Sequence, residues 1–234
     1  NIFLDGYLKD NQILNTLNVT NKILEMKSNF KFDFSDKILK YSAAINLLKF
    51  NLNSFGFNFG GGKALLSGVG LIDLRGKDQN SLEGSINLSS LKFMNNNSAI
   101  NFNPISFDQK ITTNKTEIYI KNNDLIRGEI LGNYKTREIF SLFQNKINEV
   151  YGLPSNKTLN KQSLSFNLKI FSKLIDALYP NISVGSSINL KGNLSSENKK
   201  SKFEIQLPLF SYNKMFIRDL NYELEIDSFN KNRY

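Results

Sequence analysis

The most regular feature of the chain is an alternation of apolar and polar residues with a period of two. In "SLSFNLKIF" (163–171), Leu164, Phe166, Leu168 and Ile170 alternate with polar residues. Successive side chains of an extended strand point to opposite faces of a sheet, so these four side chains share one face. The segment is therefore predicted to form a β-strand with one apolar face and one polar face.

The same alternation recurs along the chain in segments joined by short polar turns. "SNFKFDFSDKILKYSAAI" has two such segments around a turn at 35–37, which predicts an antiparallel hairpin. We count about 13 strand-like segments of this kind. The positions expected to share the apolar face are Phe30, Phe32, Phe34, Leu82, Ile86, Leu88, Ile130, Leu164, Phe166, Leu168, Ile188, Leu190, Phe203, Ile205, Leu207, Tyr222 and Leu224.

Helical patterns are few and short. Residues 136–151, "TREIFSLFQNKINEVY", carry apolar residues at helical spacing, with Thr136 as the expected N-cap. A second helix is predicted near 172–179, where Pro180 ends it. "INLLKFNL" interrupts the strand alternation and predicts a one-turn helical crossing within 45–54.

This imbalance between strands and helices sets the predicted fold. Neighbouring strands lie ~4.8 Å apart, so the predicted strands would form a sheet roughly 60 Å wide, which helices of four turns or fewer cannot cover. We predict a mostly β protein, in which an elongated antiparallel sheet curls into an open hydrophobic groove with two or three short helices. Residues 1–234 would form one continuous module. A β-sandwich or a closed barrel is the alternative, since either lets the apolar face cover itself.

Charge does not point to a specific partner. The 234 residues include 30 Lys and Arg against 21 Asp and Glu, a net charge of +9, and the excess is spread along the chain. Scattered charge is typical of a solvated surface. Phe is frequent but shares strand faces with aliphatic residues, and Arg is scarce, so no nucleic acid partner is expected.

Composition also argues against catalysis. The chain has no His and no Cys, which removes imidazole bases, thiolate nucleophiles and His or Cys metal ligands. The glycine-rich "GFNFGGGKALLSGVG" lacks the spacing of a phosphate loop, because Ala64 stands where a Ser or Thr is needed. It is interpreted as a flexible connection between strands. We expect no enzyme activity, no cofactor and no metal site.

Nothing in the sequence suggests a membrane-spanning helix, since no apolar run reaches 18 residues. The chain also starts at Asn1 without Met or a basic and apolar leader. We expect it to be part of a longer polypeptide, with any signal peptide or anchor elsewhere.

The order of these patterns resembles the TamB translocation and assembly module family, in the form found in Bacteroidetes-type bacteria, within the wider AsmA-like group. The resemblance is carried by the strand "LSFNLKIF", the short helix after it, "INLKGNLS", and the hairpin from "FEIQLPLFSY" into "FIRDLNYELE". Earlier segments, "NSLEGSINLSSLKF" and "IRGEILGNYK" leading into "REIFSLFQNKINEVYG", extend it over nearly the whole chain.

The resemblance implies a β-groove, also called a β-taco or half-pipe, that lies in the periplasm and bridges the inner and outer membranes. It implies an inner-membrane anchor outside these residues and a BamA-like outer-membrane barrel protein as partner. Proposed roles in the family are phospholipid movement to the outer membrane and help in outer-membrane protein assembly or secretion. The design is similar to that of bridge-like lipid transfer proteins.

Two functions are therefore predicted. In the first, the apolar residues named above form a non-enzymatic conduit for phospholipid acyl chains, whose head groups stay in water. In the second, the protein is a periplasmic scaffold that pairs an exposed strand edge with strands of nascent outer-membrane proteins.

Overall fold

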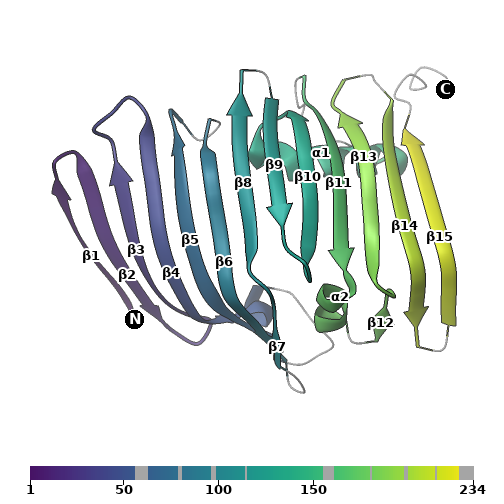
Figure 1. The fold of residues 1–234 in the computed structure, drawn as a ribbon, viewed down its shortest axis with the longest axis horizontal. Helices are drawn as coiled ribbons and strands as arrows, with labels where there is room; N and C mark the ends of the chain where they lie inside the picture. Colours follow the sequence, from purple (N-terminus) through teal and green to yellow (C-terminus); the bar gives the residue numbers. More distant parts are fainter. Residues whose placement is uncertain are drawn as a thin grey trace.

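The strands of the protein form one antiparallel sheet of 15 strands (Figure 1). This computed structural model describes residues 1–55, 63–78, 81–95, 99–113, 115–154, 161–179, 181–197, 200–213 and 215–226. The strands are β1 (Ile2–Lys9), β2 (Gln12–Thr20), β3 (Leu24–Asp33), β4 (Leu39–Asn51), β5 (Leu65–Gly76), β6 (Glu83–Met94), β7 (Ala99–Asn101), β8 (Ile105–Thr112), β9 (Lys115–Lys121), β10 (Ile126–Asn133), β11 (Ser163–Phe171), β12 (Ile182–Ser183), β13 (Ser187–Ser195), β14 (Ser201–Tyr212) and β15 (Met215–Ile226).

Strand order follows chain order almost throughout, because most strands pair with the next one along the chain. The exceptions are the short strands: β7 adds to one end of β6, and β12 pairs with β14 beyond the end of β13. The edge strands β1 and β15 do not pair with each other in the described part of the chain. The sheet is therefore open, as predicted, and the alternatives of a sandwich and a closed barrel are wrong.

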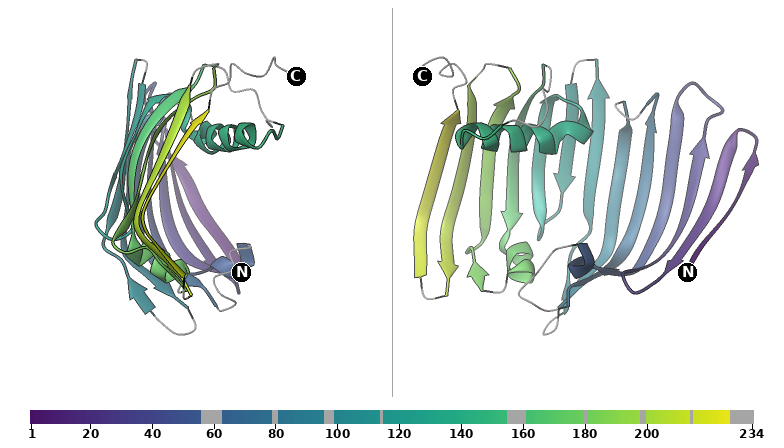
Figure 2. Two further views of the ribbon diagram at one scale, coloured as in Figure 1. Left: turned by 90° about the vertical axis from the view of Figure 1, so that its right-hand side faces the viewer. Right: turned by 180° about the vertical axis from the view of Figure 1, so that it is seen from behind.

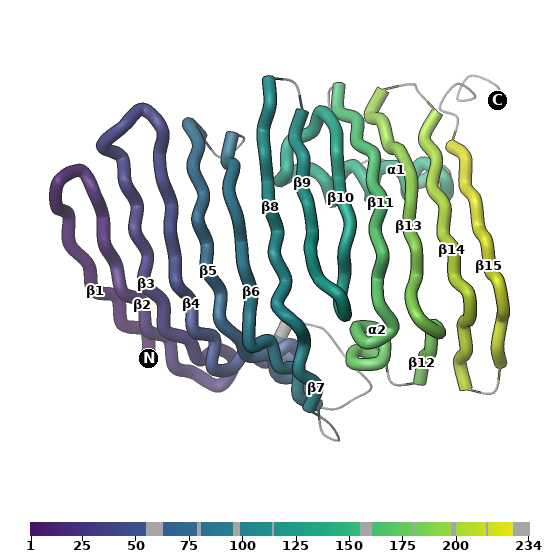
Figure 3. Tube along the Cα trace, viewed as in Figure 1, coloured from purple at the N-terminus to yellow at the C-terminus, as the bar shows by residue number. Residues whose placement is uncertain are grey.

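The sheet is strongly curved, and its strands bend into an arc when viewed along the long axis (Figure 2, left). Helix α1 (Ile139–Val150) lies on the concave side and crosses the upper ends of several C-terminal strands (Figure 2, right). Figure 3 shows the same succession of strands as a Cα trace from one edge to the other. The predicted curled sheet with an open groove is confirmed.

The other helices are short: η1 (Leu52–Phe55), η2 (Thr136–Glu138) and α2 (Ser172–Leu178). The helices predicted near 136–151 and 172–179 are thus confirmed. The one-turn helix predicted within 45–54 is present only at the end of that range, as η1, and the prediction is wrong for 45–51, because β4 continues to Asn51. A register shift of β4 against β5 between Leu47 and Phe50 accounts for the broken alternation there.

The predicted N-cap of the longest helix is also wrong. Helix α1 begins two residues later than predicted, with Glu138 as its N-cap residue and no side-chain cap hydrogen bond. Thr136 lies in η2, and its hydroxyl donates to Gln109 Oε1 at 3.1 Å. Gln162 Nε2 donates to the buried Glu138 carboxylate, so the start of α1 is tied to the residue just before β11.

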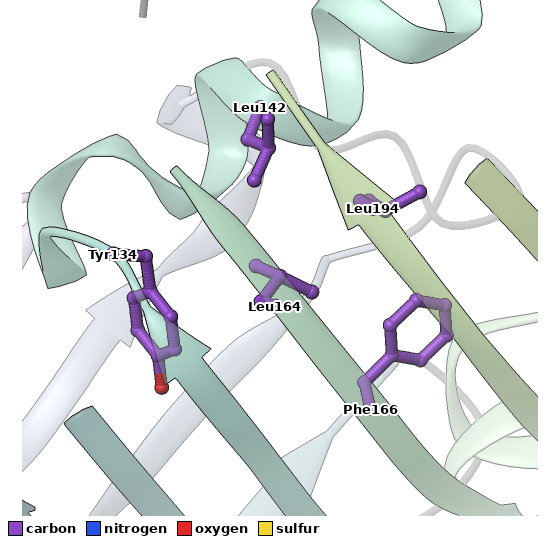
Figure 4. Packing of buried hydrophobic residues seen from close by; sticks show 5 residues of the cluster. All are labelled: Tyr134, Leu142, Leu164, Phe166 and Leu194. Carbon is purple, nitrogen blue, oxygen red and sulfur yellow. The ribbon is translucent and has the colours of Figure 1, made fainter. Parts of the chain in front are cut away.

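Two hydrophobic clusters lie at opposite ends of the strands. The upper cluster joins α1 to the sheet and consists of the buried residues Tyr134, Leu142, Leu164, Phe166 and Leu194 (Figure 4). The lower cluster packs η1 and α2 against the sheet and consists of the buried residues Ala64, Phe93, Phe102, Leu125 and Ala177. These clusters form the two rims of the concave face.

Candidate functional site: the apolar concave face

The side chains that face the concave side are identified by the helix that lies there. Leu142 of α1, 1% exposed, packs with Leu164 and Phe166 of β11 (Figure 4). The even-numbered residues of β11 therefore point to the concave side. Directly paired residues of antiparallel strands lie on the same face, so the strand register extends this assignment across the sheet.

A row of paired residues through Leu168 crosses the middle of the sheet from one edge strand to the other. We call it the central row. All its members are apolar or Gly apart from Asn15. The row runs Gly6, Asn15, Phe30, Ala43, Ile72, Ile86, Phe107, Ile120, Gly128, Leu168, Leu190, Ile205 and Tyr222.

A parallel row through Phe166 lies nearer the upper ends of the strands, and we call it the upper row. Its one strongly polar member, Gln109, donates to the Leu82 carbonyl at 2.6 Å and accepts from Thr136. The row runs Leu8, Ile13, Phe32, Tyr41, Leu74, Gly84, Gln109, Ile118, Ile130, Phe166, Gly192, Phe203 and Leu224.

The convex face has the opposite character. The paired row through Asn167 carries Lys31, Ser42, Asp73, Ser85, Asp108, Tyr119, Glu129, Asn167, Lys191, Glu204 and Glu223, with Tyr7 and Leu14 at its β1 end. The Lys202 ammonium lies 2.8 Å from Glu204 and 2.9 Å from Glu223. Its hydrogen bond holds the pKa of Glu204 below the ordinary value. This face is therefore a solvated, charged surface.

Much of the concave face between the two rims stays open. Phe32 is 37% exposed and Tyr222 is 50% exposed, while Ile86, Leu190 and Ile205 are half-buried. Among the described residues no second sheet lies over the central row. An uncovered apolar surface of this extent marks a site for an apolar ligand or partner, because soluble proteins rarely expose large contiguous apolar patches.

The structure brings together nearly all the apolar residues singled out from the sequence. Phe34 follows β3 and Leu82 precedes β6, so these two lie just outside the strands. The others lie in strands and face the concave side: Phe30, Ile86, Leu168, Leu190, Ile205 and Tyr222 in the central row, Phe32, Ile130, Phe166, Phe203 and Leu224 in the upper row, and Leu88, Leu164, Ile188 and Leu207 in the flanking rows.

Three of these residues do not offer open surface. Leu164, Phe166 and Leu207 are 3%, 4% and 8% exposed. Phe166 is enclosed by Phe143 of α1 and by Phe203, with ring centroids 5.2 and 5.6 Å away. These side chains stabilise the fold. They are not part of the open floor, as we call the area of the concave face that no helix covers.

Several floor residues were missed from the sequence. Ile72 and Leu74 alternate with Asp73 and Arg75 in β5, so the period of two is present in the sequence. The glycines just before these residues are typical of a loop, and they hid the start of the strand. The first part of that glycine-rich stretch, 56–62, lies outside the described residues. Ala64 is fully buried in the lower cluster, and β5 begins at the next residue.

A hollow of about 540 Å³ on the convex face, between β5, β6, β8 and β9, is lined mostly by charged and polar residues. Arg75 pairs with Glu83 at 2.8 Å and Lys121 pairs with Asp108 at 2.9 Å, so charges of both signs neutralise each other there. In the described residues no group of three or more acidic side chains is placed to hold a metal ion. The helices in the described residues all fall short of the length and hydrophobicity that a membrane span requires.

Comparison with known proteins returns no match: no family model fits the chain, and no curated protein and no solved structure is significantly similar to it.

Proposed function

We propose that the concave face binds the acyl chains of lipids and that the protein is a non-enzymatic conduit along which such chains move. One observation carries the proposal: the central row runs from β1 to β15 and is apolar or Gly apart from Asn15, with mostly polar residues on the opposite face. At ~4.8 Å between neighbouring strands, this row is roughly 60 Å long. Lipid head groups would remain in water at the open mouth of the groove.

Burial of apolar surface would keep an acyl chain in the groove and still allow it to move along the central row. Each methylene kept from water contributes about 0.8 kcal/mol, so a chain of about 14 methylenes is held by roughly 11 kcal/mol. Escape into water is therefore slow. Because adjacent strands present similar apolar side chains, the binding free energy changes little from one strand to the next, and movement along the row meets only low barriers.

The resemblance to the TamB family gives this proposal its cellular setting. We propose that the protein acts in the periplasm, carries phospholipid between the inner and outer membranes, and works with a BamA-like outer-membrane barrel protein. An open, curled antiparallel sheet is the architecture that the resemblance implies, and this agreement supports the proposal.

The test is to place a charge on the open floor. Ile205→Asp puts a carboxylate in the central row, and Gln206→Asp puts the same group on the exposed convex face one residue away. Native mass spectrometry with lipid extraction should find phospholipid with the wild type and with Gln206→Asp, and several-fold less with Ile205→Asp. Phe166→Asp is a poorer choice, because that buried side chain supports the fold.

The conduit proposal is abandoned if the wild-type protein carries no phospholipid and Ile205→Asp behaves as Gln206→Asp does. Circular dichroism of the two variants supplies the folding control.

The edge strands favour a second candidate function, the scaffold for nascent strands. β15 is exposed along most of its length, with Phe216 65% and Ile217 48% exposed, and β1 is exposed throughout. A free edge with apolar side chains is a template for another strand. Ile217→Lys should weaken the pairing of β15 with a nascent strand and leave the co-purified lipid unchanged. Ile205→Asp should lower the co-purified lipid and leave strand pairing unchanged.

A further inference from the structure

Helix α1 carries an exposed apolar stripe that its packing against the sheet does not use. Phe140 is 78% exposed, Ile147 is 54% exposed, and Tyr151, at the C-cap, is 73% exposed. Residues three, four or seven apart lie on the same side of a helix, so these three side chains form one line along α1, in which the exposed polar Gln144 stands between Phe140 and Ile147. The side of α1 that packs against the sheet carries the buried Leu142 and Lys146, and it does not include the stripe.

The stripe lies on the side of α1 that faces the open floor. Phe143 stacks on Phe166 of the upper row, one row nearer the middle of the sheet than Leu164. Phe140 and Ile147 are three residues before and four residues after Phe143, so they share its side of the helix.

The far side of α1 is polar. Ser141, Asn145 and Asn148 lie more than a quarter turn away from Phe143, at the helical period of about 100° per residue. The charge of the buried Lys146 is paired with Glu149 at 2.8 Å. The apolar stripe and the adjacent floor therefore carry no unpaired charge of α1.

We propose that α1 and the floor beneath it form a corner that holds one lipid acyl chain from two sides, parallel to the helix axis. The wall of the corner is the stripe Phe140, Ile147 and Tyr151, and its floor is Leu190 and Ile205, which are half-buried. This inference rests on the proposed function, and it assigns to α1 a binding role in addition to its structural one.

The dimensions and the position of the corner favour an acyl chain as the occupant. Twelve residues of α1 span ~18 Å, the width of about four strands at ~4.8 Å, and α1 contacts strands from β11 to β15. Helix α1 lies inside the curvature of the sheet, where a flat protein surface does not reach (Figure 2). A flexible linear chain fits this shape.

The test uses a photo-reactive benzoylphenylalanine residue at three positions of the full chain, in cells that contain phospholipid. Position 140 probes the wall, position 205 probes the floor, and position 71 is the control, because Leu71 is 53% exposed on the convex face. After irradiation, mass spectrometry should find phospholipid adducts at 140 and 205, several-fold above those at 71.

A second variant checks the same corner without a probe. Phe140→Gln with Ile147→Gln removes exposed apolar surface only, so α1 should remain docked, while co-purified phospholipid should fall several-fold. Leu71→Gln, matched in exposure, should change nothing.

The outcomes separate this inference from the proposed function. Lipid adducts at position 205 with none at position 140 would contradict the proposed corner but would remain consistent with the conduit. Adducts at 140 to a second copy of the chain or to another protein also overturn it. Absence of lipid adducts at both 140 and 205 overturns the conduit and the corner together.

Discussion

Individual residues shape the floor by alternating in size across neighbouring strands. The Phe166 ring lies over Gly192, its direct partner in β13. A Cβ atom at Gly192 would stand 2.7 Å from Cζ of Phe166 and 2.4 Å from the Lys202 carbonyl oxygen. Gly128 is required for a second reason, since its φ of +144° belongs to a region that other residues rarely adopt. Glycine thus makes room for large rings in an otherwise aliphatic surface.

We predict that Gly192→Ala destabilises the protein by about 1–3 kcal/mol, because the new methyl group overpacks the floor against backbone that cannot move aside. Gly70→Ala is the matched control. Its Cβ atom would meet Leu88 at 3.4 Å and Ile45 at 3.7 Å, which is ordinary contact. Urea unfolding midpoints measure the difference, and equal midpoints for the two variants would contradict the prediction.

At the scale of elements, short helices are held to the rims by polar contacts as well as by apolar packing. Lys173 of α2 donates to Asp124, in the turn between β9 and β10, at 2.6 Å. Asp124 also accepts from the Asn103 backbone at 3.0 Å, and the Asn122 side chain donates to the carbonyl groups of Asn103 and Pro104. This network fixes α2 and the turn over the lower cluster.

The same network predicts a dependence on pH. Burial alone would raise the pKa of Asp124, but hydrogen bonds from Lys173, Asn103 and Asn122 outweigh it and hold that pKa below the ordinary value. A lowered folded-state pKa contributes stability that is present above about pH 4 and is lost as the pH falls through the folded-state value. Asp124→Asn should therefore cost about 1–3 kcal/mol at pH 7, as for a hydrogen bond to a charged group.

The check is the urea midpoint of wild type and Asp124→Asn at pH 7 and pH 3, where the gap between them should narrow at pH 3. Asp36→Asn serves as control, because Asp36 forms an exposed ion pair with Lys40, worth at most about 1 kcal/mol. A gap that stays the same at both pH values would rule out the proposed contribution of the ionised carboxylate.

For the whole molecule, the important property is continuity of the apolar rows across all the long strands. Alternation within a strand makes one apolar face, and pairing in register aligns these faces from β1 to β15. Curvature then places the apolar side inside. This continuity distinguishes a conduit from a local binding pocket, because nearly every long strand contributes an apolar residue or Gly to each row, with Asn15 and Gln109 as the exceptions.

We therefore predict that a charge anywhere on the central row blocks lipid passage, whatever its distance from α1. Ile72→Asp in β5 should reduce transfer between donor and acceptor vesicles as strongly as Ile205→Asp in β14. Leu71→Asp, the adjacent residue on the convex face, is the control and should transfer normally. A block at Ile205 combined with normal transfer in Ile72→Asp would show a local pocket and contradict a continuous conduit.

The sequence predicted the main features of the fold where the pattern was strong. The period of two in 163–171 and 201–212 identified the floor residues of β11 and β14, because side-chain direction in a strand follows from backbone geometry alone. The pattern failed in β4, where a register shift near Leu47 imitated a helix. It also gave no sign that Phe166 would be covered by Phe143, since that contact joins segments whose approach depends on the whole sheet.

By itself, the sequence determined that strands dominate, which residues of each strand are apolar, and that few helices exist to cover them. Only the tertiary structure decided the register that aligns these faces into rows, the choice of an open curled sheet over a sandwich or a closed barrel, and the position of α1 along one rim. The physical reason is range: alternation is a property of consecutive residues, whereas register, curvature and the position of α1 depend on contacts between residues far apart in the chain.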